Sequence, residues 1–227
     1  MAEIGLFQNR VSDTPVPEWN LDDEATSIVR RSLEKDGYQV VVIPTRRHAE
    51  IAEAHRATLL RNIDLDVMRQ ILQAAQPESA VDAFIVLAKS RGKDPCRPET
   101  TVLIQGIGIC AGPRMQMSSA IPGGETVDIE GPYGNRMLAP FASFRMTLFR
   151  ASDFEVLANR AAAIRRSNML GLPEPASVPY QRIHAAAYKE SFGQFTEEEK
   201  RAIRKVIIGL LETTVPETLK AMGLISQ

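Results

Sequence analysis

Hydrophobic residues recur near the N-terminus with the period of an amphipathic helix. Residues 21–36 begin with acids after Asn20, a residue type that caps helix N-termini, and are followed by Gly37, a typical helix stop. The apolar positions inside this stretch fall on one helical face: Ala25, Ile28, Val29 and Leu33. The spacing predicts a helix over 21–36 with one buried face, preceded by an extended segment over 1–19.

Uninterrupted apolar runs predict buried strands in the first half of the chain. Residues 40–43 (VVVI) and 83–89 (AFIVLAK) show no alternation, as expected of parallel strands that are covered on both faces. Two stretches with helical spacing, 46–62 and 66–76, lie between them. This part of the chain therefore predicts the parallel start of a mixed sheet.

After residue 99 the pattern becomes a meander of strands. Residues 100–110 predict a long strand, and residues 137–150 alternate between apolar and polar side chains, which is typical of an antiparallel strand with one face in water. Residues 151–153 predict a tight connection into a second strand within 154–163, giving a hairpin. The three prolines of 167–181 indicate a crossover connection rather than a domain boundary.

The C-terminal part carries the clearest helix signal. Thr196 and Glu199 have the spacing of a capping box, and Pro216 predicts the end of this helix and the start of a short one that stops at Gly223. Five apolar residues lie on one face of the longer helix: Ile203, Val206, Ile207, Leu210 and Leu211.

Together these elements predict one α/β domain over 1–227. Its sheet is mixed, with about five strands, parallel at the start and antiparallel at the hairpin end. Helices pack on the sheet, and an amphipathic C-terminal helical segment over 196–223 covers one face.

Charge and cysteine content narrow the class of protein. The formal net charge of -1 gives no electrostatic reason to expect nucleic acid as a partner. No apolar stretch is long enough for a transmembrane segment, and the sequence as written shows no secretory signal, so the compartment stays open. Two cysteines exclude a disulfide framework. We interpret Cys96 and Cys110 as independent thiols, with a single bridge as the alternative if their strands are neighbours.

Residues 106–111 match the pattern of a dinucleotide-binding turn, G-x-G-x-x-A. That turn must lead directly into a helix whose N-terminus holds the phosphates, whereas residues 112–135 contain too many prolines and glycines for such a helix. We therefore interpret Gly106 and Gly108 as strand residues that allow a helix or neighbouring backbone to approach closely. No cofactor is expected.

No other motif predicts a catalytic residue or a metal site. The sequence lacks a nucleophile elbow, a phosphate-binding P-loop, a zinc-binding H-E-x-x-H and a C-x-x-C pair. An alternative hypothesis is a small-molecule enzyme that uses the glycine-bearing strand and the 112–135 loop, because a loop of that length is often functional. Its candidate ligand-binding residues are Gly106, Gly108, Arg114, Asp128 and Glu130.

The hairpin sequence FASFRMTLFRASDFEVLANRAAA, residues 141–163, resembles the strand, short turn and E-V-L-A hairpin of certain bacterial envelope lipoproteins. These are related to the curli secretion lipoprotein and to the amino-terminal domain of TolB, in which the turn usually reads D-x-x-T-G-E-V-L. The order of DAFIVLAKSRG and TVLIQGIGICAG before the hairpin is similar, and the tail after residue 195 is similar to uncharacterised proteobacterial proteins of this design.

The resemblance implies a function by assembly with other proteins. It suggests a non-enzymatic binding or assembly protein, a homo-oligomer or a subunit of a bacterial envelope complex, with protein partners and no catalytic residues. In this chain the turn reads R-A-S-D-F-E, so Phe154 stands where the usual pattern has glycine.

Overall fold

A computed structural model describes residues 2–4, 9–11, 16–43, 69–70, 72–73, 80–96, 103–113, 136–162, 178, 180 and 192–226. The helix expected over 46–62 lies outside these residues, as do most of the helix expected over 66–76 and most of the crossover at 167–181.

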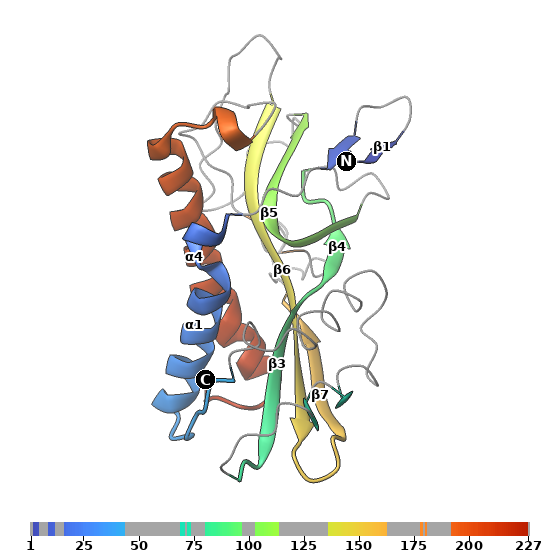
Figure 1. Ribbon diagram of the computed structural model, residues 1–227, viewed down its shortest axis with the longest axis vertical. Helices are drawn as coiled ribbons and strands as arrows, with labels where there is room; N and C mark the ends of the chain where they lie inside the picture. The colour runs from blue at the N-terminus through green and yellow to red at the C-terminus, as the bar shows by residue number, and fades with distance from the viewer. Residues whose placement is uncertain are drawn as a thin grey trace, which may run out of the picture.

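The described part of the chain is built around a five-stranded sheet (Figure 1). Its strands are β3 (Ala83–Lys89), β4 (Arg91–Lys93), β5 (Leu103–Pro113), β6 (Arg136–Arg150) and β7 (Val156–Ala161). The strand order is β3-β6-β5-β4, and β7 also pairs with β6. Every pair is antiparallel. The number of strands is the one expected, but β4 was not predicted, residues 40–43 form no strand, and the expected parallel start is not found among the described strands.

The parallel start fails because residues 40–43 form no strand. After α1 (Leu21–Lys35) the chain runs through residues 38–43 with no regular secondary structure. The side chains of Val40 and Ile43 pack against the core, but Val41 and Val42 are 56% and 42% exposed. The expectation of a strand buried on both faces was therefore wrong here.

The N-terminal residues add a small second sheet. Strands β1 (Ala2–Ile4) and β2 (Asn9–Val11) pair antiparallel, and the 3-10 turn η2 (Pro17–Trp19) leads into α1. The segment over 1–19 thus contains a two-stranded ribbon where a purely extended segment was expected.

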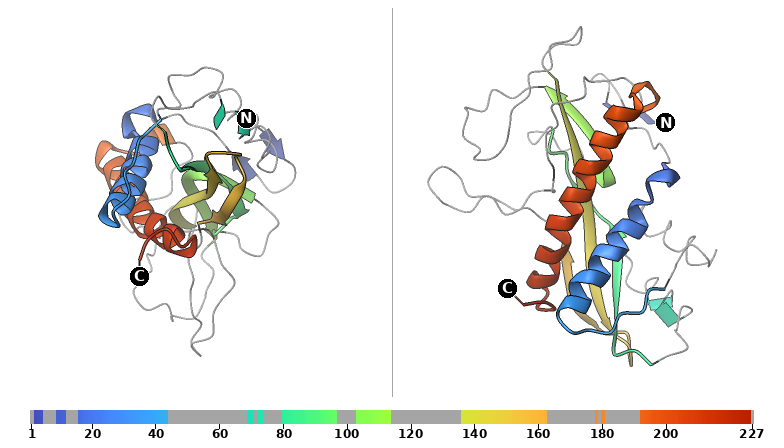
Figure 2. Two further views of the ribbon diagram at one scale, coloured as in Figure 1. Left: turned by 90° about the horizontal axis from the view of Figure 1, so that it is seen from below. Right: turned by 90° about the vertical axis from the view of Figure 1, so that its left-hand side faces the viewer.

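Two helices, α1 and α4 (Glu197–Ala221), lie side by side on one face of the main sheet (Figure 2). Their apolar faces meet Ala142, Phe144 and Met146 of β6 in the largest hydrophobic cluster. Arg204 of α4 also bonds to Glu24 of α1, with its Nη2 2.9 Å from Oε1. Neither helix combines the length and the apolar character needed to cross a bilayer.

Local signals explain the buried face and the C-terminal end of α1, but not its N-terminal cap. The predicted face is confirmed, since Ala25, Ile28, Val29 and Leu33 are all buried. At the C-terminus, Gly37 has a φ of 92° and the N–H groups of Gly37 and Tyr38 donate back to the last turn, as expected of a glycine stop. Asn20, however, has a left-handed backbone and makes no side-chain cap bond, so its expected role as a side-chain cap was wrong.

Helix α4 continues through Pro216, where the sequence predicts a break. The predicted capping box of Thr196 and Glu199 is present, and Gly223, with a φ of 73°, ends the segment as expected. Proline removes one helical hydrogen bond, but the carbonyl that loses its partner belongs to exposed Glu212, where water can replace it. Apolar side chains on both sides of Pro216 are buried, which holds the two halves in line: Leu210, Leu211, Val215 and Leu219.

Strand β6 is buried on both faces, contrary to the expectation that its polar face meets water. Ser143 and Thr147 are 3% and 2% exposed. The face opposite the helices carries two smaller clusters. One surrounds Phe149 and Phe154, and the other surrounds Cys96, Cys110 and Phe141. Alternation therefore located the strand correctly, whereas small polar residues did not mark an exposed face.

The β6–β7 hairpin is confirmed, and its turn contains an unusual residue. Residues 151–153 form the turn, and Phe154 follows with a φ of 56°, a conformation that bulky residues rarely adopt. Its ring is buried and stacks on Phe84, with ring centroids 6.0 Å apart. Burial of this ring offsets the backbone strain.

The pKa of Asp153, in the same turn, is lowered, mainly because its carboxylate accepts a hydrogen bond from the backbone N–H of Glu155.

Ile207→Asp should unfold or grossly destabilise the protein. Ile207 is 2% exposed within the main cluster. An unpaired carboxylate buried at this position should lower the free energy of unfolding by at least about 2–3 kcal/mol. The control is Lys205→Asp, which adds the same group to the exposed face of the same helix. Thermal and denaturant unfolding compare the two. An Ile207→Asp variant that melts like Lys205→Asp would show that α4 is not docked on the sheet as described.

Candidate functional site

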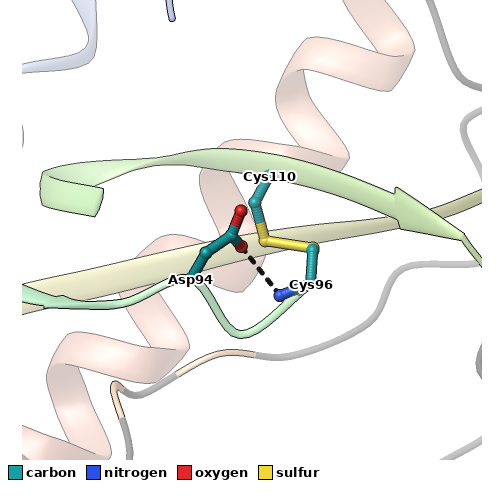
Figure 3. A group of neighbouring side chains, drawn as sticks. All are labelled: Asp94, Cys96 and Cys110. Atoms are coloured by element: carbon teal, nitrogen blue, oxygen red, sulfur yellow. Dashed lines mark hydrogen bonds between the residues drawn. A yellow bond between two sulfur atoms is a disulfide. The ribbon is translucent and has the colours of Figure 1, made fainter. Parts of the chain in front are cut away.

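Three ligand-capable side chains meet between the turn that follows β4 and strand β5. Asp94 directly follows β4, Cys96 lies two residues further on in a turn, and Cys110 lies on β5. A carboxylate oxygen of Asp94 and the two sulfur atoms all lie within 4.8 Å of one another, and all three residues are buried (Figure 3).

The turn Asp94-Pro95-Cys96 places these groups by local hydrogen bonding. Asp94 Oδ1 accepts a hydrogen bond from the backbone N–H of Cys96 at 2.8 Å, the pattern by which aspartate commonly stabilises a turn. Proline between them fixes one backbone dihedral. The sequence D-P-C therefore predisposes the carboxylate to lie beside the cysteine.

Cys96 and Cys110 form a disulfide, with 5.9 Å between their Cα atoms. The interpretation as independent thiols was wrong, and the alternative of a single bridge holds. The β4–β5 register alone would not bring the two cysteines together, because it pairs Lys93 with Leu103 and so directs Cys96 away from Cys110. The turn after β4 instead reaches the part of β5 beyond Gly106, where Cys110 pairs with Ala139 of β6. Sequence spacing alone did not reveal that pairing.

The bridge lies within a hydrophobic group that we call the disulfide cluster: Cys96, Cys110, Ala139, Phe141 and Val178, with Ile104 and Tyr180 packed against it. Cys110 Sγ lies 3.4 Å from the carbonyl oxygen of Ala139. Gly92 of β4 also belongs to this site, because an added Cβ would collide with the side chain of Val178. Asp94 and Gly92 are site residues that sequence reasoning missed; the nearness of Asp94 to a cysteine was the available signal.

Of the five candidate ligand residues, two can be placed. Gly106 and Gly108 lie on β5, whereas Arg114, Asp128 and Glu130 lie outside the described residues.

Gly106 marks the point at which β5 changes partner. Gln105 pairs with Arg91 of β4, and the next residue, Gly106, pairs with Ser143 of β6. The φ of Gly106 is 71°, a region that glycine enters readily and other residues enter at a cost. Glycine thus allows the bend that carries β5 from β4 to β6.

Side chains fill the space beside both glycines. A Cβ on Gly106 would lie 2.9 Å from Cδ of Lys89, and a Cβ on Gly108 would lie 2.9 Å from Cζ of Phe141. Phe141 is the cross-strand partner of Gly108, so its ring covers the glycine directly. Close packing is therefore present, but side chains rather than a helix or backbone make it. Ile107 lies between the two glycines and Ile109 follows Gly108. Both isoleucines pack instead against the core that the helices cover.

Comparison of the chain with protein-family models, with curated proteins and with solved structures found no match.

Gly106→Ala and Gly108→Ala should each destabilise the protein. The first substitution forces a positive φ on alanine, which should cost about 1–2 kcal/mol of stability. The second places a methyl group against the ring of Phe141, which should cost about 1–3 kcal/mol. Gly209→Ala is the matched control, because its Cβ meets open space within α4 and should stabilise the helix by up to about 1 kcal/mol. Denaturant melts measure all three. Neutral or stabilised variants at both β5 positions would contradict the packing and backbone explanations.

Loss of the disulfide should cost about 3 kcal/mol, the value expected for a bridge that closes a loop of about 15 residues. The variant Cys96→Ala/Cys110→Ala and reduced wild type should unfold at similarly lower denaturant concentrations, and reductant should leave the variant unchanged. Thiol alkylation before and after reduction reports the bridge itself. If both cysteines are alkylated in the unfolded protein without reductant, the Cys96–Cys110 bridge does not form.

Proposed function

We propose that the chain is a non-enzymatic assembly protein that forms a homo-oligomer as a component of a bacterial envelope complex. The observation that carries the proposal is a cluster of exposed apolar side chains in the segment 38–43 (YQVVVI). Tyr38, Val41 and Val42 are 46%, 56% and 42% exposed. Large apolar side chains grouped in this way are typical of protein–protein contact sites.

The chemistry of this segment favours pairing with a second copy of the chain. It is rich in β-branched residues and uncharged, so two copies can lie side by side without like-charge repulsion. A symmetric dimer brings the same patch together from both subunits, which an apolar, uncharged segment tolerates well.

Two further observations support an envelope location. The Cys96–Cys110 disulfide is typical of proteins in oxidising compartments such as the bacterial periplasm. In addition, Phe154 has a positive φ at the position where the envelope lipoprotein hairpin usually has glycine. The backbone of this turn is thus compatible with the hairpin that the sequence resembles, although the side chain differs.

The alternative enzyme function gains no support from the described residues. Lys89 and Phe141 occupy the space beside Gly106 and Gly108 that a bound ligand would require. We therefore favour assembly.

Val41→Lys and Val42→Lys should each shift the protein from oligomer to monomer. The added ammonium group would lose its water on association and would face the same positive charge on the second copy. Sedimentation velocity over a range of protein concentrations measures the association, and thermal unfolding checks that the variants stay folded. Leu157→Lys is the control, since Leu157 is also 46% exposed but belongs to a different element, β7.

Wild type that remains monomeric at the highest soluble concentration would overturn the homo-oligomer. If Leu157→Lys dissociates the oligomer and the two valine variants do not, the interface lies elsewhere.

A further inference from the structure

We propose that Asp94, Cys96 and Cys110 form a binding site for one thiolate-preferring divalent cation, such as Zn²⁺, when the disulfide is reduced. The same sulfur pair would then alternate between a disulfide and a metal site. This inference is independent of the proposed assembly function.

The donor set fits such a cation. Thiolate sulfur and carboxylate oxygen are both common zinc ligands, and three protein ligands leave one coordination position for a further ligand. In a tetrahedral site with Zn–S bonds of about 2.3 Å, two sulfur atoms lie roughly 3.8 Å apart. The three ligand atoms already lie within 4.8 Å of one another, so reduction requires only a small adjustment around them.

Local structure permits this adjustment. Cys96 lies in a turn next to β4, a strand of three residues at the end of the sheet order, whereas Cys110 is held within the long strand β5. The turn can therefore move while β5 stays in place.

Asp94 is preorganised for the role. Its Oδ1 accepts the hydrogen bond from Cys96 N–H, which holds the carboxylate beside the sulfur atoms. A carboxylate has about four lone-pair positions, so an oxygen that accepts a backbone hydrogen bond leaves capacity to bind a cation.

The chemical steps balance with a dithiol reductant of the kind that reduces protein disulfides. The dithiol gives two electrons and two protons, the Cys96–Cys110 bond breaks, two thiols form, and the reductant becomes a disulfide. Binding of the divalent cation then releases both thiol protons and gives two metal–sulfur bonds, while Asp94 binds as the carboxylate.

The test uses the full chain and Co²⁺ as a spectroscopic probe, followed by Zn²⁺. Protein reduced with a phosphine and freed of reductant without oxygen should bind one Co²⁺ per chain. Binding should produce the near-ultraviolet absorption of thiolate-to-cobalt charge transfer, and Zn²⁺ should displace the cobalt. Oxidised protein should show no such band.

Three variants separate the proposed ligands from general effects. Cys96→Ala should abolish the charge-transfer band. Asp94→Asn, which keeps both sulfur atoms, should weaken Co²⁺ binding at least about tenfold, since even residues that only support a ligand are worth that much. Asp82→Asn, at an exposed position before β3, should bind like wild type. Circular dichroism of each reduced protein checks that it is folded.

Two results would overturn the proposal. One is reduced, folded wild type that shows no thiolate–cobalt band. The other is Asp94→Asn that binds Co²⁺ as tightly as wild type, which would leave the carboxylate without a part in the site.

Discussion

Strand β6 constrains almost everything else in the described structure. Its 15 residues pair with β5 along one half, and with both β3 and β7 along the other, so those two strands lie on its opposite edges. Both of its faces are covered, by the helices on one side and by two smaller clusters on the other. Positions that are covered in this way must hold residues that pack, as small Ser143 and Thr147 do, whereas Arg145 between them is half-buried and donates to Asn159 of β7.

The elements that the sequence predicted correctly are those determined by residues close together in the chain. The buried face of α1, the capping box of α4, strand β3 and the β6–β7 hairpin all follow from neighbouring residues: an apolar face, a threonine with a glutamate three positions later, an apolar run and a short turn. Where prediction failed, the deciding contact was distant in sequence. Val41 and Val42 carry strand propensity but have no described strand partner, and Pro216 stays helical because buried side chains flank it.

The candidate site shows the same division. D-P-C is a local pattern that fixes the turn at residues 94–96, and it could have been recognised. The bridge to Cys110 could not, because it depends on β5 pairing first with β4 and then, past the bend at Gly106, with β6. The two glycines that suggested a nucleotide site serve that bend and the ring of Phe141. A short glycine pattern therefore says little until the pairing of its strand is known.

The contact between α1 and α4 joins two segments that lie far apart in the sequence. Arg204 and Glu24 are separated by 180 residues, and the N–H of Ser226 donates to Asp36 across 190. During synthesis, α1 emerges long before α4, so the two helices cannot pack until α4 has also been made. Until then the apolar face of α1 and one face of β6 are open to solvent or to other proteins. Apolar surface exposed in this way favours aggregation until the helices have packed on the sheet.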